Sequence, residues 1–243
     1  GNEVVFTSLP GPKEVEAVAL GEQGILGGAA TSSIYVDLST SSPAAIRRIE
    51  QVFQGRGIAV LDAPVSGGVN GAADASLAVM VGGEETAYRR VKPLLDVLGS
   101  NVFYCGSVGN GMVCKICNNL LSMGIGNLLA ESLILGVKAG VDLKVLVEVI
   151  TKSSGNSRRL EERMPRYLFE GNFEPGFAAA LAAKDVRLAT DLGRELGLSM
   201  ELSNLIDQKH VEVLARGWGD KDSDVIAVLQ EEKAGVQLRI PRD

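Results

Sequence analysis

The sequence has 243 residues, with 24 Lys and Arg, 30 Asp and Glu and a hydrophobic content of 46%. This length exceeds a typical single domain, and the apolar content is high enough for packed cores, so the composition excludes a disordered chain. The net charge of -6 argues against a basic surface that could bind nucleic acid or an anionic membrane. The chain has only three cysteines, which argues against a disulfide framework.

The first hundred residues alternate β-branched runs with helical patterns, which is typical of a parallel sheet with crossover helices. The predicted strands cover residues 4–9, 34–39, 58–62, 77–81 and 102–104. The predicted helices between them cover residues 13–20, 42–54 and 84–98. Because the chain opens on Gly1 and passes at once into a strand, we expect its beginning to be missing.

After Gly111 the pattern changes to apolar residues at every third or fourth position. It predicts helices over residues 112–139, 142–151, 158–167, 178–196, 201–216 and 224–233. The expected organisation is therefore an α/β domain over residues 1–109 and an all-helical domain over residues 110–243. Charged residues, Asn or Gly interrupt every apolar run before it reaches the ~18 residues of a membrane span, so no membrane association is expected.

A turn rich in small residues follows the third predicted strand, where parallel sheets commonly place ligands. It reads Asp62-Ala63-Pro64-Val65-Ser66-Gly67-Gly68. The amides of Gly67 and Gly68 and the Ser66 hydroxyl form a candidate nest for a carboxylate or phosphate oxygen. The alternative interpretation is a tight turn with no ligand, and the motif alone leaves both open.

A second cluster joins a glycine-rich turn, residues 106–111, to the start of a predicted helix. Lys115 and Asn119 lie four residues apart and therefore on one face of that helix, where they could hold a hydroxyl or carbonyl oxygen. A cation near a helix start opposes the helix dipole, which favours a function for Lys115 over a solvated side chain.

Other reactive side chains in the sequence indicate no metal site. Cys114 and Cys117 spell C-x-x-C, but no second pair completes a zinc site, and we expect both thiols to be small buried apolar groups. The single histidine, His210, lies in the middle of a predicted helix, so a His-based catalytic triad is not expected.

Two charged segments are interpreted as solvated surface on composition alone. One is Lys184-Asp185, at the start of a helical stretch. The other contains four arginines, whose positive charge is partly offset by two glutamates between them. The arginines are Arg158, Arg159, Arg163 and Arg166.

Together, three motifs in this order resemble the β-hydroxyacid dehydrogenases, and within them the 3-hydroxyisobutyrate dehydrogenase branch. Residues 62–68, followed by Met80-Val81-Gly82-Gly83, are similar to the substrate-binding signature of the family. The spacing of Gly106, Gly109, Gly111, Lys115 and Asn119 resembles the catalytic signature. The segment Lys184-Asp185-x-x-Leu188-Ala189 is similar to the one that reaches the cofactor from the helical domain.

The resemblance implies a partial Rossmann-type NAD(P)-binding domain followed by a substrate and dimerisation domain like the C-terminal domain of 6-phosphogluconate dehydrogenase. It implies hydride transfer between NAD or NADP and a small β-hydroxy acid or its semialdehyde, with 3-hydroxyisobutyrate as the first choice. Lys115 would be the general acid and base, and Asn119 would orient the reacting group. The implied substrate contacts are Ser66, Gly67, Gly68 and Asn119, and the implied cofactor contacts are Leu9, Pro10, Thr40 and Lys184.

This chain departs from the family pattern at two places. Glu14 stands where the 3-hydroxyisobutyrate enzymes carry an Asn that contacts the cofactor. The G-x-G-x-x-G turn that binds the pyrophosphate does not occur in the sequence, so we expect that segment to lie upstream of Gly1.

Several alternatives stay open beside this hypothesis. The chain could be a non-catalytic dimeric scaffold or binding protein of the same fold, or a reductase of tartronate semialdehyde, succinic semialdehyde or glyoxylate. An imine reductase is disfavoured, because relatives with that activity usually lack the lysine found at position 115. The expected assembly is a homodimer or homotetramer through the helical domain, in the cytoplasm.

Overall fold

The computed structural model describes residues 2–240 and divides the chain into two compact units, 1–118 and 119–243. The long helix α6 (Asn110–Lys138) contributes residues to both units. The domain boundary expected at Gly109 lies just before this helix and stays a prediction.

The first unit contains a six-stranded sheet. Its strands are β1 (Val4–Thr7), β2 (Ile34–Asp37), β3 (Ala59–Asp62), β4 (Val65–Ser66), β5 (Ala78–Gly83) and β6 (Asn101–Gly106). The order is β1-β2-β3-β5-β4, and β6 pairs with the β5 strand.

The sheet is parallel across β1, β2 and β3 and again between β5 and β6, but β5 runs antiparallel to β3 and to β4. The expectation of a parallel sheet is therefore confirmed only in part. Between β3 and β5 the chain forms the two-residue strand β4 and the short helix α4 (Gly68–Ala73), both missed from the sequence. Such a short connection carries no crossover helix long enough to return the chain in the parallel direction.

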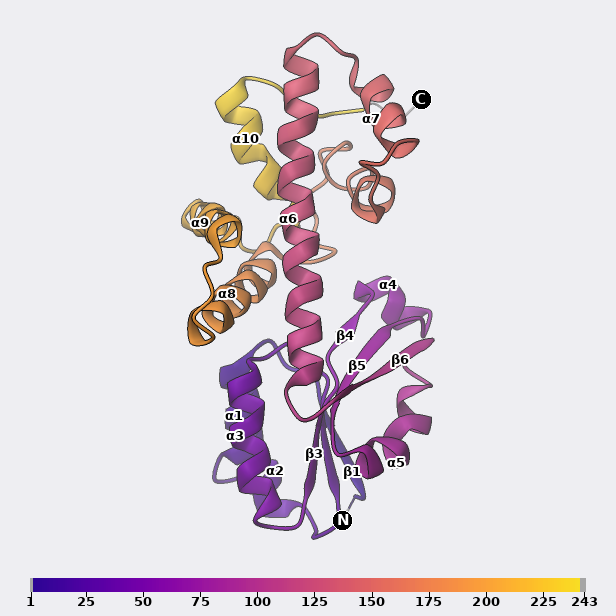
Figure 1. Ribbon diagram of the computed structural model, residues 1–243, viewed down its shortest axis with the longest axis vertical. Coiled ribbons are helices and arrows are strands. Elements are labelled where there is room, and N and C mark those ends of the chain that lie inside the picture. Colours follow the sequence, from indigo (N-terminus) through magenta and orange to yellow (C-terminus); the bar gives the residue numbers. More distant parts are fainter. Residues whose placement is uncertain (1, 241–243) are drawn as a thin grey trace. The chain divides into compact units, whose positions relative to one another are not determined.

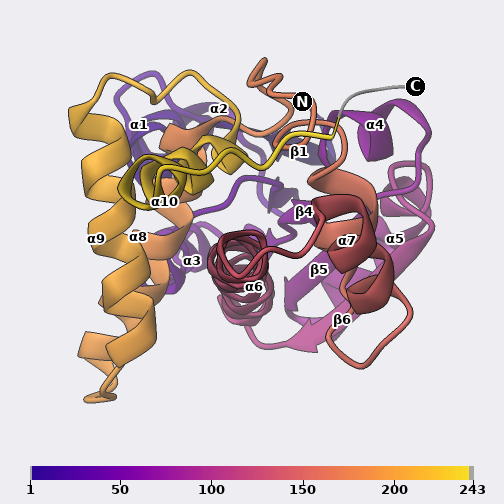
Figure 2. The same ribbon diagram turned by 90° about the horizontal axis from the view of Figure 1, so that it is seen from above.

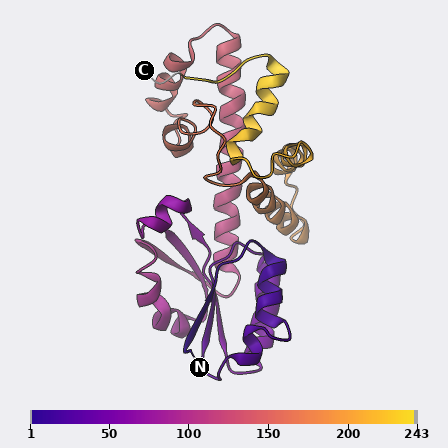
Figure 3. The same cartoon turned by 180° about the vertical axis from the view of Figure 1, so that it is seen from behind.

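Helices cover both faces of the sheet in the first unit (Figures 1 and 3). On one face lie α1 (Pro12–Leu20), the short α2 (Ile25–Gly28) and α3 (Pro43–Gln54), and on the other lies α5 (Glu85–Leu95). Apolar residues of α1 and α3 pack on Tyr35 and Val60, whereas those of α5 pack on Val36 and Leu61. Ser42 caps α3, because its Oγ accepts a hydrogen bond from the Ala45 amide at 3.0 Å.

In the second unit, the regular structure of the described residues, up to residue 240, is helical. Its elements after α6 are α7 (Leu143–Thr151), the π-helical turn η1 (Arg159–Arg163), α8 (Ala179–Glu195), α9 (Glu201–Ala215), the 3-10 turn η2 (Ser223–Val225) and α10 (Ile226–Ala234). Figure 2 looks along α6, which has α7 on one side and α8 and α9 on the other. A core built on Leu133, Leu160 and Leu168 joins α6 to the segments that follow it.

Two arginines that sequence reasoning placed on a solvated helix face are engaged in the helical unit. Arg159 is buried, and its guanidinium pairs with the carboxylate of Asp224 and donates to Ser122 Oγ at 3.2 Å. Arg163 donates to an Asp222 carboxylate oxygen at 2.6 Å. The expectation was wrong because both partners come from a segment about sixty residues further along the chain.

Helix α6 also corrects the expectation that no apolar run is long enough to span a membrane. Its 29 residues include an 18-residue window of mean hydropathy 1.7, which by length and composition alone could cross a bilayer. The same helix carries buried Lys115 and Asn119, and its Leu129 and Leu133 belong to the core of the helical unit. Of that window, 39% is buried in the structure.

Candidate active site

The carboxylate of Asp62, at the end of β3, holds the start of α6. One oxygen accepts a hydrogen bond from the Gly109 amide at 2.7 Å and the other from the Met112 amide at 2.8 Å. These amides lie at the start of α6, where helical backbone donors lack partners of their own, so the carboxylate caps the helix. Burial raises the pKa of Asp62 to about 6, although these backbone hydrogen bonds lower it.

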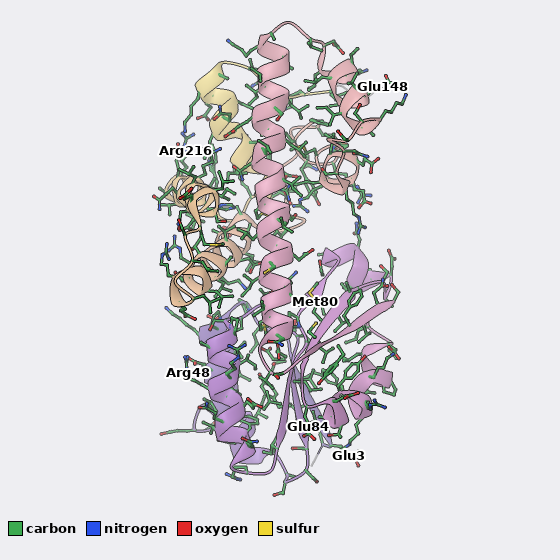
Figure 4. The ribbon with its side chains drawn as sticks, in the orientation of Figure 1. Glu3, Arg48, Met80, Glu84, Glu148 and Arg216 are labelled. Carbon is green, nitrogen blue, oxygen red and sulfur yellow. The ribbon has the colours of Figure 1, made fainter. Side chains whose placement is uncertain are left out.

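Glycines occur around Asp62 because the backbone segments approach one another closely. A Cβ at Gly82 would lie 2.5 Å from Asp62 Oδ1, and a Cβ at Gly111 would lie 2.2 Å from the Met80 carbonyl oxygen. Figure 4 labels Met80 beside the first turns of α6. The glycines at 82 and 111 therefore let β3, β5 and the helix start meet, which explains their place in the sequence motifs.

The turn after Asp62 is open on its outer side. Ser66 ends β4 and is partly exposed, and the two glycines that follow have φ angles of +141° and +65°. These angles favour glycine. A Cβ at Gly68 would meet nothing within 4 Å, so this backbone is accessible to a ligand from outside.

Lys115 and Asn119 lie on one face of α6, and each is only 7% exposed. Asn119 Nδ2 donates a 2.5 Å hydrogen bond to Asp185 Oδ2, on α8 of the helical unit. Asp185 is itself buried and also pairs with Lys184 Nζ at 3.2 Å. The segment 184–185 is therefore no exposed charged turn, contrary to the composition-based interpretation.

A hydrogen-bond network joins the carboxyl ends of β1 and β2. The buried carboxylate of Asp37 accepts hydrogen bonds from Thr7 Oγ1 at 2.9 Å and from Ser39 Oγ at 2.6 Å. Ser39 Oγ in turn accepts one from the Leu9 amide at 2.8 Å. The two segments that carry Leu9 and Thr40 are thus held side by side, as parallel strand ends allow.

This edge of the sheet fits a polar, anionic cofactor. Pro10 is exposed there, and Leu9 and Thr40 are partly exposed. Helix α1 begins directly after this edge, and Gly11, its N-cap residue, makes no side-chain cap. The first amides of such a helix are available to a ligand, and the helix dipole favours negative charge on it.

The cysteines differ from their predicted state. Cys114 and Cys117 are exposed and Cys105 is half-buried, so the expectation of buried apolar thiols was wrong. Both residues of the C-x-x-C face away from the core because α6 turns its apolar side, with Met112 and Ile116, inward.

His210 is a buried residue of α9 with a structural role. Its side chain is 1% exposed, and Nδ1 donates to the Ile206 carbonyl at 2.9 Å if that nitrogen carries the proton. Burial lowers the pKa of His210, which keeps the ring neutral near pH 7.

Two sequence families match this chain, and together they cover most of it. Residues 1–106 match the NAD binding domain of 6-phosphogluconate dehydrogenase, and residues 109–230 match the NAD-binding domain of NADP-dependent 3-hydroxyisobutyrate dehydrogenase. A 2-(hydroxymethyl)glutarate dehydrogenase from Eubacterium barkeri is 35% identical over 98% of this chain and 79% of its own length. The chain belongs to the β-hydroxyacid dehydrogenase family. The resemblance to this family and the expectation of an NAD or NADP cofactor are thereby confirmed.

Other members of the β-hydroxyacid dehydrogenase family agree with this assignment. The NAD-dependent L-serine dehydrogenase of Pseudomonas aeruginosa is 34% identical over 97% of this chain and 81% of its own length. Among solved structures, the 3-hydroxyisobutyrate dehydrogenase of Mycobacterium tuberculosis with L-serine matches with a TM-score of 0.84 and 31% identity. That match covers 94% of this chain and 79% of the other and confirms the expected α/β and helical fold.

Sequence reasoning missed three residues that organise the site. Asp37, Asp62 and Asp185 are all buried carboxylates that accept hydrogen bonds from the neighbourhood of predicted site residues. The available signal was that each Asp occurs within a quoted motif: Asp62 opens the glycine-rich turn, Asp37 precedes Ser39 and Thr40, and Asp185 follows Lys184. A buried carboxylate nearly always has a hydrogen-bond or ion-pair partner, but the identity of that partner cannot be predicted from the sequence.

Proposed function

We propose that this chain catalyses reversible hydride transfer between NAD or NADP and a small β-hydroxy acid. The first candidate substrate is 3-hydroxyisobutyrate. The observation that carries the proposal is the buried pair Lys115 and Asn119 on one face of α6. The capping of that helix by Asp62, four residues before the turn at Ser66, supports it.

Lys115 holds the proton at the reacting oxygen. Its Nζ donates a proton to the carbonyl oxygen during reduction and accepts one from the hydroxyl during oxidation. Asn119 orients the same oxygen through its amide, and Asp185 fixes that amide by accepting its Nδ2 hydrogen bond. A neutral amide beside the lysine adds hydrogen bonding without adding charge.

The turn at residues 66–68 binds the substrate carboxylate. The Ser66 hydroxyl and the amides of Gly67 and Gly68 are donors on an accessible backbone, and the open space beside Gly68 leaves room for the ligand. Holding the carboxylate there and the hydroxyl at Lys115 fixes a short acid at both ends, which aligns its carbinol carbon for reaction.

The residues proposed to hold the nicotinamide cofactor are Leu9, Pro10, Thr40 and Lys184. The adjacency of the Leu9 and Ser39 segments, and the uncapped start of α1 beside them, support the first three. When bound, the nicotinamide ring supplies or accepts the hydride. Glu14, in the first turn of α1, brings a negative charge to this edge, which disfavours a further phosphate on the ligand nearby.

The names of three relatives suggest the substrate class more closely. 2-(Hydroxymethyl)glutarate, L-serine and 3-hydroxyisobutyrate all carry a hydroxymethyl group on the carbon next to a carboxylate. They differ only in the third substituent of that carbon. We therefore propose a 3-hydroxypropanoate unit as the recognised part, and a panel that varies this substituent would rank the substrates. Preference for tartronate semialdehyde, succinic semialdehyde or glyoxylate would replace this proposal with one of the reductase alternatives.

Lys115 gives the direct test. In the full-length protein, Lys115→Ala and Lys115→Arg should each lower kcat by roughly 10²-fold to 10⁴-fold, because the arginine keeps its proton at all relevant pH values. Cofactor affinity, measured by nicotinamide fluorescence titration, should change little. Lys138→Ala, at the exposed far end of the same helix, is the matched control and should keep full activity. Near-normal turnover in both Lys115 variants would refute the proposal.

Ser66 tests the carboxylate site separately. Ser66→Ala should raise KM for the hydroxy acid by roughly tenfold, because one hydrogen bond to a charged group is lost, while KM for the cofactor stays within about twofold. Equal increases in both Michaelis constants would contradict the assigned role.

We also propose a homodimer through the helical unit. Four apolar side chains of α6, spaced so that they share one helix face, are at least 39% exposed, and they are Leu121, Ile125, Leu128 and Leu135. An exposed apolar stripe of this kind favours burial against a second copy. Leu128→Glu should convert the protein to a monomer in light scattering after size exclusion, and an unchanged dimer or a tetramer would argue for another interface.

A cytoplasmic location is proposed as well. It is supported by the sparse and odd count of three cysteines, which is typical of proteins in a reducing compartment. Cell fractionation followed by immunoblotting would test it.

A further inference from the structure

Two thiols face one another where β6 passes into α6. Cys105 is the last residue but one of β6, and Cys114 follows four residues after α6 begins at Asn110. Between them Gly106 and Gly109, with φ angles of +95° and +91°, reverse the chain. The Asn110 side chain donates to the Cys105 carbonyl at 3.0 Å, which fixes the strand end against the first helical turn.

We propose that Cys105 and Cys114 are a modification site that peroxide closes to a disulfide, adjacent in sequence to Lys115. The side chains of the two cysteines interact directly. Cys114 is exposed, so a small oxidant reaches it, and Cys105 lies half-buried behind it. Cys117, the second cysteine of the C-x-x-C, is not part of this pair.

Geometry favours Cys105 over Cys117 as the partner of Cys114. Cys114 and Cys117 both lie inside α6, three residues apart, and Cβ atoms at that spacing are about 5–6 Å apart. A disulfide needs Cβ atoms roughly 3.5–4.5 Å apart, so bridging them would distort the helix. Cys105 and Cys114 belong to different elements, and their side chains already interact across the turn between β6 and α6.

The order of reaction follows from the two environments. Burial, and then the neighbouring Cys114 thiol, raise the pKa of Cys105 to about 12, so Cys105 stays protonated and Cys114 reacts first. The Cys114 sulfur attacks hydrogen peroxide: a sulfur–oxygen bond forms, the oxygen–oxygen bond breaks, and the leaving hydroxide takes up the Cys114 proton as water. The Cys105 sulfur then attacks Cys114, forming the disulfide, while the departing oxygen leaves as water with the Cys105 proton. Two thiols are oxidised, and one peroxide is reduced to two waters.

The disulfide would act on the proposed catalytic helix. It ties the second turn of α6 to β6, and Cys114 is directly followed by Lys115. A small displacement of a catalytic group is costly, so oxidation should lower kcat by roughly tenfold or more and a reductant should restore it. This consequence rests on the proposed function, whereas formation of the disulfide does not.

Peptide mapping distinguishes the possible products. Trypsin leaves the bond between Lys92 and Pro93 intact and cuts after Arg90 and Lys115, so peptide 91–115 contains Cys105 and Cys114 together. Cys117 falls in peptide 116–138. The full-length protein is treated with hydrogen peroxide, blocked with an alkylating agent, digested and weighed by mass spectrometry. We expect peptide 91–115 to lose the mass of two hydrogens and to regain it with dithiothreitol.

Matched variants complete the experiment. Cys117→Ser keeps the proposed pair and should give the same product, whereas Cys114→Ser and Cys105→Ser should give none. A cross-link between peptides 91–115 and 116–138, oxygen addition alone, or unchanged mass in the wild type would overturn the proposal. If the disulfide forms but kcat is unchanged, the modification site stands and its link to the catalytic helix fails. If Lys115→Ala leaves turnover normal, the proposed function fails independently of the thiols.

Discussion

Asn119 donates its side-chain hydrogen bond to Asp185 at 2.5 Å, between two buried residues separated by 66 positions in the sequence. An amide can rotate and present either its oxygen or its nitrogen, and a carboxylate accepts only from the nitrogen. Asp185 therefore fixes the orientation of the Asn119 amide, with Nδ2 turned toward the carboxylate.

Asp185 should consequently act through Asn119. Asp185→Ala is expected to lower kcat by roughly tenfold to hundredfold, because the amide is no longer held in one orientation. A double-mutant cycle with Asn119→Ala measures the coupling, and the double variant should be little worse than Asn119→Ala alone. Losses that multiply would show that the two residues act independently. The cycle is needed because Asp185 also pairs with Lys184.

The buried ion pair of Arg159 and Asp224 should be essential to the helical unit. Arg159→Met leaves the buried Asp224 carboxylate with only the longer contact to Arg163 Nε, at 3.4 Å, which should cost about 3 kcal/mol in the free energy of unfolding. The neighbouring Arg158 pairs with Glu162 on the surface, so Arg158→Met is the matched control and should change stability by less than about 1 kcal/mol. Urea denaturation of both variants checks the prediction, and similar midpoints would contradict it.

Asp62 should make stability depend on pH. Its pKa is about 6 in the folded protein against an ordinary value of 3.8. Between these values the folded state binds more protons than the unfolded state, so the free energy of unfolding falls as pH rises through that window. Because the two values differ by about two pH units, the advantage of the wild type over Asp62→Asn should shrink by roughly 3 kcal/mol between pH 4 and pH 7.

Chemical denaturation of the wild type and Asp62→Asn at several pH values measures this difference. The other carboxylates titrate in both proteins and cancel. A difference between the two proteins that stays constant with pH would show that Asp62 titrates normally.

Gly82 should tolerate no side chain. In Gly82→Ala the new Cβ would lie 2.5 Å from Asp62 Oδ1 and 2.8 Å from the Ser107 carbonyl oxygen. Overpacking of this kind costs typically about 1–3 kcal/mol, which should appear as a lower Tm. Gly28→Ala is the control, because a Cβ there meets nothing within 4 Å, and in a helix it should be neutral or stabilising by up to about 1 kcal/mol. Equal Tm values for the two variants would contradict the close approach seen at Gly82.

The amino-acid sequence by itself determined most of the longer elements, because strand and helix periodicity are local, whereas the short α2, β4 and α4 were missed. The run Ile34–Asp37 was predicted as a strand and the segment Pro43–Gln54 as a helix from neighbouring residues alone. The placement of Lys115 and Asn119 on one face follows from the helix repeat. The family was also recognisable from the order and spacing of three short motifs.

Only the tertiary structure decided which charged groups are buried and what they contact. Asp62 meets the Met112 amide across 50 positions, and Arg159 meets Asp224 across 65. Composition predicted that both arginines of η1 are solvated and that both cysteines of the C-x-x-C are buried. Each of these expectations was wrong. The physical reason is that the cost of burying a charge depends on its partner, and here the partner arrives from a distant part of the chain.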